Sequence, residues 1–198
     1  MPDNNQNLLN TYLSELLHTD KEKFMELLFK SYYSQLCNFV FQMVKERDTA
    51  EDIVQEVFLK VWKNKENLDP EKSIKGYLYR SASNATLNFL EKHQRNVPME
   101  ESHLQSSELT KNETEETLGV KEIEEKISQA IDTLPPQAKT SFIMSRYEEM
   151  SYAEIAEALG ISVKTVEKHM GRALSQLRKS LNAYLKHLIS ILIFLDLF

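Results

Sequence analysis

The chain has 198 residues and carries 24 Lys and Arg against 30 Asp and Glu, which gives a formal net charge of −6 and a pI near 5.5. This length corresponds to one large domain or two small ones. Only four Gly and five Pro are present, which excludes turn-rich β-sandwiches and barrels and favours an all-α protein. The acidic balance argues at first against a nucleic-acid binder, whose surface is usually basic.

The single cysteine, Cys37, excludes an internal disulfide framework and any zinc site built from cysteines. Residues 1–7 lack the charged and apolar regions of a secretory signal. No apolar stretch approaches the roughly 20 residues that span a bilayer. We therefore expect a cytoplasmic protein with no direct membrane insertion.

Motifs of the common enzyme classes are absent: the sequence has no GxGxxG, Walker loop, GxSxG or HExxH. Two Glu-x-x-His pairs, Glu15/His18 and Glu100/His103, have the spacing used by di-iron bundles, but no set of inward-facing Glu accompanies them. We expect no enzymatic activity, no cofactor and no metal site.

The charge is distributed unevenly along the chain. Residues 1–95 carry 13 basic and 14 acidic side chains, residues 96–125 carry 2 and 9, and residues 126–198 carry 9 and 7, so the three segments stand at −1, −7 and +2. The middle segment is rich in Ser, Thr, Asn, Gln and Glu, as flexible linkers are. The predicted organisation is two small helical domains at 1–95 and 123–183, a flexible acidic linker at 96–122 and an apolar tail at 184–198.

Hydrophobic periodicity predicts four helices in the first domain. A capping-box pattern at Thr19–Glu22 precedes the second of these helices. A loop is expected from Asn64 to Ser73, between the third helix and the fourth. The expected helices are Asn7–His18, Lys21–Glu46, Asp48–Lys65 and Ile74–His93.

The third expected helix has two stripes at helical spacing. The first is a complete apolar stripe that predicts a core face: Ala50, Ile53, Val54, Val57, Phe58, Val61 and Trp62. The second, on an adjacent face, consists of Asp52, Gln55, Glu56, Leu59 and Lys63. Such a stripe is commonly a solvated face, but an apolar Leu59 among acidic and amide groups favours a surface that binds a partner protein.

This helix also carries a family resemblance. The segment Asp48–Trp62, DTAEDIVQEVFLKVW, resembles region 2.2 of sigma-70 factors, especially the small extracytoplasmic-function (ECF) group, and Phe24–Leu36 is similar to region 2.1. In that family the surface formed by these regions docks on the clamp coiled coil of the RNA polymerase β′ subunit. The resemblance therefore implies that Asp52, Gln55, Glu56 and Leu59 bind core polymerase.

The fourth expected helix places Arg80, Asn84 and Asn88 at i, i+4 and i+8, opposite its apolar side. Asn is a poor helix former, but its amide offers both a donor and an acceptor and can read base edges. The segment Tyr77–Leu90 resembles sigma regions 2.3–2.4, although Ser83 departs from the Arg-Asn-like pair of the family. The resemblance implies that these three residues recognise a melted −10 strand, with one base flipped into a pocket near the 64–73 loop. The alternative is that these side chains only face water.

The second domain begins near Leu134, and Phe142, Ile143 and Tyr147 are expected in its core. The segment Ser151–Val166 matches a helix-turn-helix, in which Gly160 permits the tight turn and Ser162 caps the following helix. The face of that helix expected to be buried consists of Val163, Val166, Met170, Ala173, Leu174, Leu177 and Leu181.

The opposite face of this helix is basic. Five basic residues and one acidic residue lie between Ser162 and Ser180. In helix-turn-helix proteins the start of the second helix contacts base edges and other basic residues hold phosphates. The residues predicted to face DNA are Lys164, Thr165, Lys168, His169 and Arg172.

The helix-turn-helix resembles sigma region 4, which reads the −35 element and touches the polymerase β flap, and it equally resembles the output domain of LuxR-type regulators. In a LuxR-type response regulator the N-terminal half would be a receiver domain, which needs an α/β pattern. The N-terminal half of this sequence is helical throughout. The sequence is therefore identified as an ECF sigma factor that directs core polymerase to promoters. The resemblance also implies control by a membrane-bound anti-sigma factor. The alternative is a stand-alone LuxR-like regulator with a helical sensing or dimerisation domain.

An apolar segment, Leu188–Phe198, ends the chain, and region 4 does not require it. As a helix it would be roughly 16 Å long, about half the core of a bilayer. The first interpretation is an extension of the last helix that packs back on one of the domains. The second is a binding site for an inhibitory partner or another copy of the chain.

Overall fold

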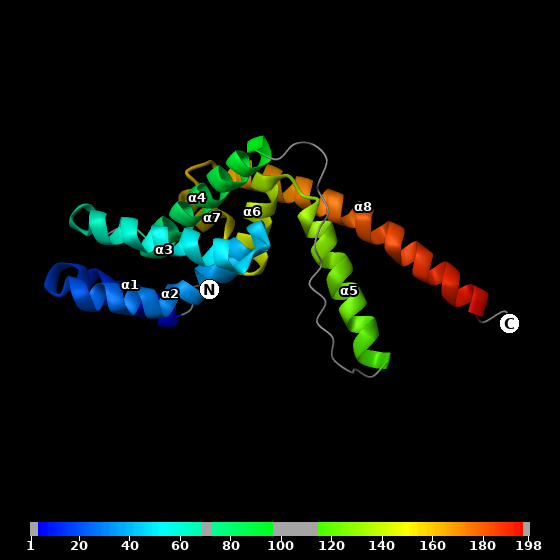
Figure 1. Cartoon of the computed structure of the whole chain (residues 1–198), viewed down its shortest axis with the longest axis horizontal. Coiled ribbons are helices and arrows are strands. Elements are labelled where there is room, and N and C mark those ends of the chain that lie inside the picture. The colour runs from blue at the N-terminus through cyan, green and yellow to red at the C-terminus, as the bar shows by residue number, and fades with distance from the viewer. Residues whose placement is uncertain (1–3, 69–72, 97–114, 196–198) are drawn as a thin grey trace.

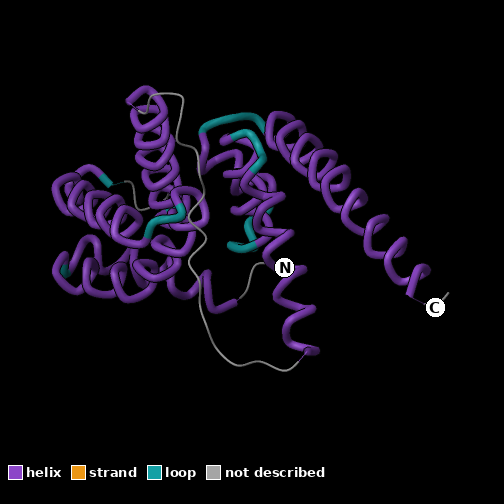
Figure 2. The backbone as a smooth tube through the Cα atoms, turned by 45° about the vertical axis from the view of Figure 1, so that its right-hand side comes forward, coloured by secondary structure: helices purple, strands orange, loops and turns teal. Residues whose placement is uncertain are grey.

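The computed structural model describes residues 4–68, 73–96 and 115–195, with side-chain surroundings described for 8–66, 68, 73–93 and 123–182. Over these ranges the chain forms eight α-helices and one short 3₁₀ turn, and contains no strand (Figures 1 and 2). The prediction of an all-α fold is confirmed.

The N-terminal half is a bundle built around its longest helix. Helix α2 packs against α1, α3 and α4, and α3 packs against α4. Burial of a large apolar side chain contributes roughly 1.5–3 kcal/mol, so the buried face of α2 is a main source of stability in this half. That face consists of Phe24, Leu28, Tyr32, Leu36, Phe39, Val40 and Met43. The elements are α1 (Asn4–Thr19), α2 (Lys21–Val44), α3 (Arg47–Asn64), η1 (Lys65–Asn67) and α4 (Ile74–Asn96).

Helix α2 has well-defined ends. Asp20 is its N-cap, since its carboxylate accepts a hydrogen bond of 3.1 Å from the backbone N–H of Lys23. The sequence pattern predicted Thr19 as the N-cap, one residue too early. The Thr19 hydroxyl instead donates a hydrogen bond to the carbonyl of Glu15. Lys45 ends the helix in the left-handed region, with φ of 62°, which allows α3 to begin two residues later.

The apolar stripe of α3 lies in the core as predicted, except for its last member. Trp62 is 39% exposed, and the ammonium group of Lys65 lies 3.7 Å from the centre of its ring. With 3.6 residues per turn, each step of four residues rotates the stripe by about 40°. Trp62 therefore ends about 120° from Ala50, beyond the edge of the buried face.

The C-terminal half consists of α5 (Glu115–Asp132), α6 (Pro136–Arg146), α7 (Tyr152–Leu159) and α8 (Val163–Leu195). Helix α5 begins inside the range expected to be linker, whose residues 97–114 lie outside the described residues. Helix α8 packs against α5, α6 and α7. Tyr147, expected in the core, is 51% exposed because it follows the end of α6.

The helix-turn-helix is formed by α7 and α8. Ser151 and Glu154 make a reciprocal capping box at the start of α7, and Gly160 ends this helix in the left-handed conformation with φ of 66°. The hydroxyl of Ser162 accepts a 3.1 Å hydrogen bond from the backbone N–H of Thr165. The expected roles of Gly160 and Ser162 are therefore confirmed.

The buried face of α8 is narrower than the sequence predicted. Val166, Met170, Ala173 and Leu177 are buried, whereas Val163 and Leu174 are 43% and 44% exposed. On a helical wheel centred on Val166, Val163 and Leu174 lie about 60–80° to the same side, on the flank of the buried stripe. Leu181 is half-buried.

The two halves of the protein pack against each other, α2 on α6 and α4 on α7. At one side of this contact, the Lys45 ammonium lies 3.1 Å from the Asp132 carboxylate, which also pairs at 2.8 Å with the buried Lys139. Desolvation lowers the pKa of Lys139 while its pairing with Asp132 opposes that shift. These links cross from the end of α2 to the end of α5 and the start of α6.

Helix α8 has 33 residues and is roughly 50 Å long (Figures 1 and 2). The apolar segment continues this helix as far as Leu195. The side-chain surroundings of this segment are not part of what the structure describes. Both interpretations of the segment therefore remain predictions. No helix of the described part of the chain is long and apolar enough to cross a membrane.

The turn between α7 and α8 gives a stability prediction. Gly160→Ala should lower the free energy of unfolding by about 1–2 kcal/mol, because the left-handed conformation is unfavourable for a residue with a Cβ atom. Urea denaturation followed by far-UV circular dichroism measures the change. Gly171→Ala is the matched control: its Cβ meets nothing within 4 Å, so it should raise stability by about 0.5–1 kcal/mol. Equal effects of the two substitutions would contradict the argument.

Candidate protein and nucleic-acid interfaces

The first candidate surface lies on α3 and is called the α3 surface: Asp52, Gln55, Glu56 and Leu59. All four side chains are exposed, and Leu59 is 57% exposed. The opposite face of α3 is buried against α2 and α4, which fixes the direction in which the surface points. An exposed apolar residue within a rigid polar face is suited to binding another protein.

The α3 surface continues onto α2 through aromatic side chains that the sequence analysis did not single out. Phe29 is 45% exposed, stacks on Tyr33 with ring centres 4.4 Å apart, and lies 5.1 Å from the ring of Phe58. Gln55 hydrogen-bonds Tyr33, whose pKa is raised mainly by burial. Phe29 and Tyr33 are four positions apart on the same helix, and this spacing could have indicated that the α3 surface extends onto α2.

The second candidate surface lies on α4 and is called the α4 surface: Arg80, Asn84 and Asn88. All three side chains are exposed, as predicted. Ser83, which departs from the family pattern, is buried and points away from this surface. The guanidinium of Arg80 lies against Gly160 of the helix-turn-helix, where an added Cβ atom would stand 2.9 Å from Nη2.

The third candidate surface lies at the start of α8 and is called the α8 surface: Lys164, Thr165, Lys168, His169 and Arg172. The three basic side chains are exposed. Thr165 is half-buried and shares the Ser162 cap, with its hydroxyl 2.8 Å from that of Ser162. The structure thus presents a row of cations at the start of the second helix, where a helix-turn-helix contacts DNA.

His169 lies at the edge of the α8 surface and turns toward α6. Its Nδ1 atom is 3.2 Å from the hydroxyl of the buried Ser141. Burial lowers the pKa of His169, and the nearby charges of Lys168 and Arg172 lower it further. The neutral imidazole is therefore the favoured form in this structure.

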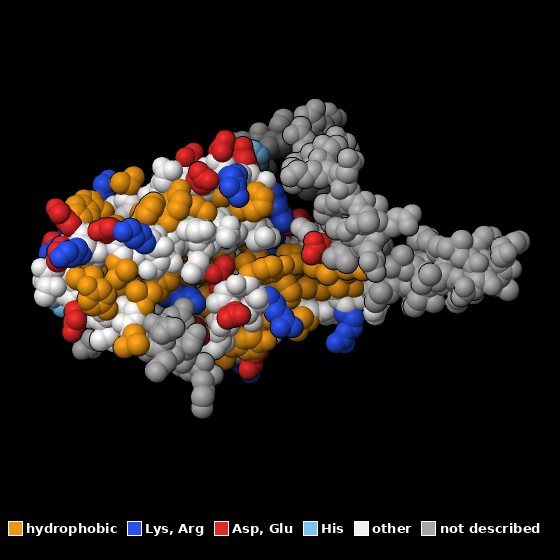
Figure 3. Space-filling model, turned by 90° about the horizontal axis from the view of Figure 1, so that it is seen from below, with side chains coloured by type: hydrophobic (Ala, Val, Ile, Leu, Met, Phe, Trp, Pro, Cys, Tyr) orange, Lys and Arg blue, Asp and Glu red, His pale blue; other side chains and the backbone are white. Residues whose placement is uncertain are grey.

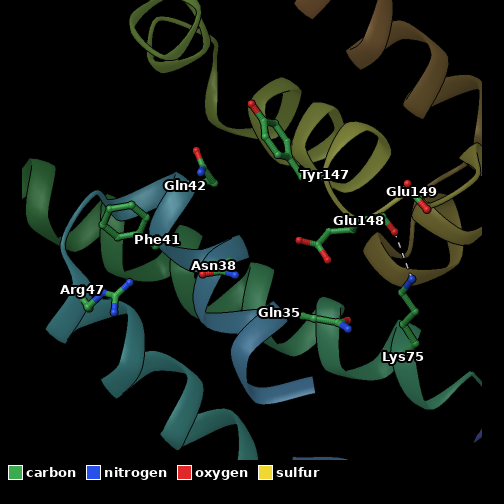
Figure 4. Close-up of a pocket in the computed structure, with 9 residues that line it drawn as sticks. All are labelled: Gln35, Asn38, Phe41, Gln42, Arg47, Lys75, Tyr147, Glu148 and Glu149. Carbon is green, nitrogen blue, oxygen red and sulfur yellow. Dashed lines mark hydrogen bonds between the residues drawn. The ribbon is translucent and has the colours of Figure 1, made fainter. Parts of the chain in front are cut away.

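Between the two halves lies a polar cleft of about 600 Å³ (Figure 4). Lys75 of α4 donates a 3.3 Å hydrogen bond to the backbone carbonyl of Glu148, and the buried hydroxyl of Tyr79 donates to the Glu148 carboxylate. Desolvation raises the pKa of both Tyr79 and Glu148. The cleft is lined by Gln35, Asn38, Phe41, Gln42, Arg47, Lys75, Tyr147, Glu148 and Glu149.

A second cavity, of about 280 Å³, lies between the end of α4 and the α8 surface. Leu87, Leu90 and Glu91 of α4 line one side of it, and His169 and Arg172 line another. The start of α6, from Pro135 to Ala138, completes the lining. The candidate DNA-binding residues of α8 therefore lie next to the helix that carries the α4 surface.

Some sequence expectations concern residues that the structure does not describe. Residues 69–72 of the loop expected to hold a flipped base lie outside the described residues, as does the Glu100/His103 pair. Within the described residues no group of three or more His, Cys, Asp or Glu side chains is arranged to hold a metal ion.

Figure 3 shows one face of the molecule, on which acidic and basic side chains are intermingled with apolar ones.

Comparison with protein families matches both halves of the chain. Residues 28–96 match the model of sigma-70 region 2, and residues 124–177 match the model of sigma-70 region 4. The α3 and α4 surfaces lie in the first match, and the α8 surface lies in the second.

Three known proteins are similar to this chain over nearly their whole length. The RNA polymerase sigma factor YlaC of Bacillus subtilis is 27% identical over 79% of this chain and 91% of the relative. The ECF RNA polymerase sigma factor SigW of the same organism is 26% identical over 88% and 97%. The fold resembles that of the sigma factor RpoE in complex with the anti-sigma factor NepR from Bartonella quintana, with a TM-score of 0.60, 18% identity and coverage of 79% and 96%.

The surroundings of His169 give a pH prediction. Its imidazole should titrate below the ordinary value near 6.5, because burial and two neighbouring cations disfavour the charged form. Since the pKa is lower in the folded state, the stability that neutral His169 contributes is present above pH 6.5 and is lost as the pH falls through the folded-state value. Two-dimensional NMR titration measures the pKa, with His169→Gln to assign the signal. A pKa at or above 6.5 would show that the ring faces solvent.

Proposed function

The chain belongs to the sigma-70 family as a member of its ECF group, and from this premise we propose how its surfaces divide the work of transcription initiation. An ECF sigma factor directs core RNA polymerase to specific promoters and starts DNA-templated transcription there. The chain has the two parts that this activity requires. The assignment of individual residues to polymerase and DNA is our proposal.

We assign the α3 surface to core polymerase, at the clamp coiled coil of the β′ subunit. The observation that carries this assignment is the exposed Leu59 within a rigid polar face. Phe29 and Tyr33 extend the apolar area onto α2. A small apolar centre with a polar rim is the usual anatomy of an interface that forms and dissociates.

The α4 surface is assigned to the melted −10 strand and the α8 surface to the −35 duplex. Asn84 and Asn88 are exposed without an evident role in packing, and their amides can pair with the edges of unstacked bases. Lys164, Lys168 and Arg172 present cations to phosphates and base edges of the major groove. We further propose that the C-terminal half touches the polymerase β flap and that the protein itself catalyses no reaction.

A stand-alone LuxR-like regulator is not favoured. That alternative needs an N-terminal half with a sensing or dimerisation role, whereas residues 28–96 match sigma-70 region 2. The helix-turn-helix alone would not separate the two functions. The N-terminal match is therefore the discriminating observation.

Multi-round transcription with purified core polymerase tests the proposed function. The full chain should produce transcripts that start at defined promoters, whereas core polymerase alone should not. The same chain without polymerase should bind promoter duplex weakly, because most of its net negative charge lies in residues 96–125 and the two flanking segments are nearly neutral. Absence of any promoter-dependent transcript, together with nanomolar duplex binding at physiological salt, would overturn the proposal.

Two variants should separate polymerase binding from DNA opening. Gln55→Ala with Glu56→Ala should weaken the binding of core polymerase by about tenfold or more, which corresponds to roughly 1.4 kcal/mol. Asn84→Ala should leave core binding unchanged and lower the yield of open complexes on a promoter. Fluorescence anisotropy measures the first effect and permanganate footprinting the second. If both variants lose core affinity equally, the two surfaces do not have separate roles.

We also propose an inhibitory partner of the anti-sigma class, anchored in the membrane. The proposal is supported by the similarity to a sigma factor whose structure was solved with an anti-sigma factor bound. A candidate partner purified separately should abolish the promoter-specific transcript when added at an equal amount. It should leave transcription by a polymerase carrying an unrelated sigma factor unchanged. Unaltered transcription with every candidate that binds the chain would contradict the proposal. We place the sigma factor itself in the cytoplasm.

A further inference from the structure

The sequence makes the last turns of α8 apolar on every side. Seven of the eight residues from Leu188 to Leu195 are Leu, Ile or Phe, and Ser190 is the exception. The helix continues through this range, and Figures 1 and 2 both show its end leading away from the other helices. A helix that is apolar all round is normally buried. The path of the backbone therefore favours a cover from outside this chain.

Helix α5 carries further exposed apolar side chains near the point where α8 leaves it. The two helices meet where the side-chain amide of Gln176 donates a 2.8 Å hydrogen bond to the carbonyl of Thr133. From there they diverge toward the start of α5 (Figures 1 and 2). Ile123 and Ile127 continue the face of α5 on which Ile131 is buried, yet they are 48% and 37% exposed. The divergence of the helices thus leaves apolar side chains of α5 exposed.

The two arms that extend from this junction carry opposite charge. The α5 arm, residues 115–127, contains five Glu and two Lys, which gives a formal charge of −3. The α8 arm, residues 178–195, contains one Arg, two Lys and no Asp or Glu, which gives +3. Because the arms diverge, their outer turns do not lie against each other within one chain. A second copy of the chain can supply a neighbour for both.

Two-fold symmetry satisfies both arms at once. In an isologous dimer the same surface of each copy meets the other copy. The α5 arm of each copy then lies beside the α8 arm of the other, so a charge of −3 faces a charge of +3 twice. A partner of another kind would have to match an acidic arm, a basic arm and an apolar segment together, whereas a second copy matches all three by its own sequence.

The apolar surface of the arms is large enough for a stable dimer. Burial of a Leu, Ile or Phe side chain removes roughly 60–120 Å² from water, so the seven apolar residues of 188–195 together with Ile123 and Ile127 can bury about 500–1,100 Å² in each copy. A specific interface of standard size buries about 800 Å² per partner. The arms reach that size without any contribution from the rest of the molecule.

A lipid surface fits these features less well. A helix that lies in a membrane interface has one apolar and one polar face, whereas residues 188–195 are apolar all round. A helix inserted end-on would carry Asp196 toward the centre of the bilayer, where a carboxylate is costly. The acidic α5 arm would also be brought toward anionic head groups.

We propose that two copies of the chain pair through these arms, with each α5 arm against the α8 arm of the other copy and the two apolar segments at the centre. The α8 arm begins beyond Arg172, the last residue of the α8 surface. The proposal therefore does not rest on the proposed function, and its tests use neither polymerase nor promoter DNA. Failure of the dimer and failure of the transcription assay are distinguishable.

Reversal of the charge on one arm at a time tests the pairing. Glu124→Lys with Glu125→Lys gives a chain with a basic α5 arm, and Arg178→Glu with Lys179→Glu gives a chain with an acidic α8 arm. All four side chains are exposed. Each altered chain alone should dimerise at least tenfold more weakly than the unaltered chain, because like charges then face each other. An equal mixture of the two should form a mixed dimer about as tightly as the unaltered chain, because both of its contacts join opposite charges.

Sedimentation velocity of the full chain over about 1–100 μM measures the fraction of dimer, and urea denaturation shows whether each variant remains folded. Glu15→Lys with Glu22→Lys is the matched control. It makes the same change of net charge at exposed sites of the N-terminal half and should leave dimerisation unchanged. A chain that is monomeric throughout this range would overturn the proposal, as would charge-reversed chains that dimerise like the unaltered one or stay monomeric when mixed.

The apolar segment is tested separately. Leu188→Gln with Leu192→Gln, four positions apart on one face of the helix, should weaken the dimer at least tenfold, because two large apolar side chains are removed from its centre. Flotation with vesicles of phosphatidylcholine and phosphatidylglycerol distinguishes a lipid surface from a second copy. The unaltered chain should stay in the soluble fraction as a dimer. Recovery of a monomeric chain with the vesicles would overturn the dimer and assign the segment to lipid.

Discussion

Helix α2 buries one side chain in almost every turn, because Phe24, Leu28, Tyr32, Leu36 and Phe39 follow each other at spacings of three and four residues. On this buried face it contacts α1, α3 and α4, and it also contacts α6 of the C-terminal half. The direction of α3 is therefore fixed by α2, and with it the direction of the α3 surface. The same helix connects the bundle to the second half, where Lys45 at its end pairs with Asp132. A long apolar stripe is thus the constraint on which the placement of the candidate surfaces depends.

Much of this arrangement follows from local rules that a sequence displays. The helix periods predict α2, α3 and α4 to within a few residues, and Gly160 and Ser162 predict the turn before α8 because only certain residues satisfy its backbone. Two of the misplaced core residues, Trp62 and Leu174, have a common cause. Trp62 and Leu174 each occupy the flank to which a stripe of period four rotates on a helix of period 3.6. A residue on the flank of a buried face is covered only if the neighbouring helix extends over it. The sequence of one helix does not show how far its neighbour extends.

The contacts between the halves could not be predicted in the same way. Tyr79 and Glu148 are 69 positions apart. Tyr79 lies within the segment Tyr77–Leu90, whose family resemblance assigns it no contact, and Glu148 belongs to no motif. Tyr79 in isolation resembles any aromatic residue of an amphipathic helix, and Glu148 follows a helix end at which an exposed carboxylate is ordinary. The contact of His169 with Ser141 could not be predicted for the same reason. The orientation of a side chain at the edge of a helix face depends on the element that packs beside it. Long-range pairings of this kind depend on the relative placement of two structural units, which local periodicity does not determine.

The acidity of the whole chain and the basic α8 surface are compatible because the charges are separated along the sequence. Residues 96–125 carry −7 of the formal charge, and their repulsion of phosphates is screened beyond roughly 8–10 Å at physiological salt. The two segments that flank these residues are nearly neutral, so the chain as a whole offers little attraction for duplex DNA. This charge distribution suits a protein that is to bind DNA only together with polymerase. As the proposed DNA-reading residues, Lys164, Lys168 and Arg172 can then be cationic without the chain occupying the large excess of non-promoter DNA, because the rest of the chain adds little non-specific attraction.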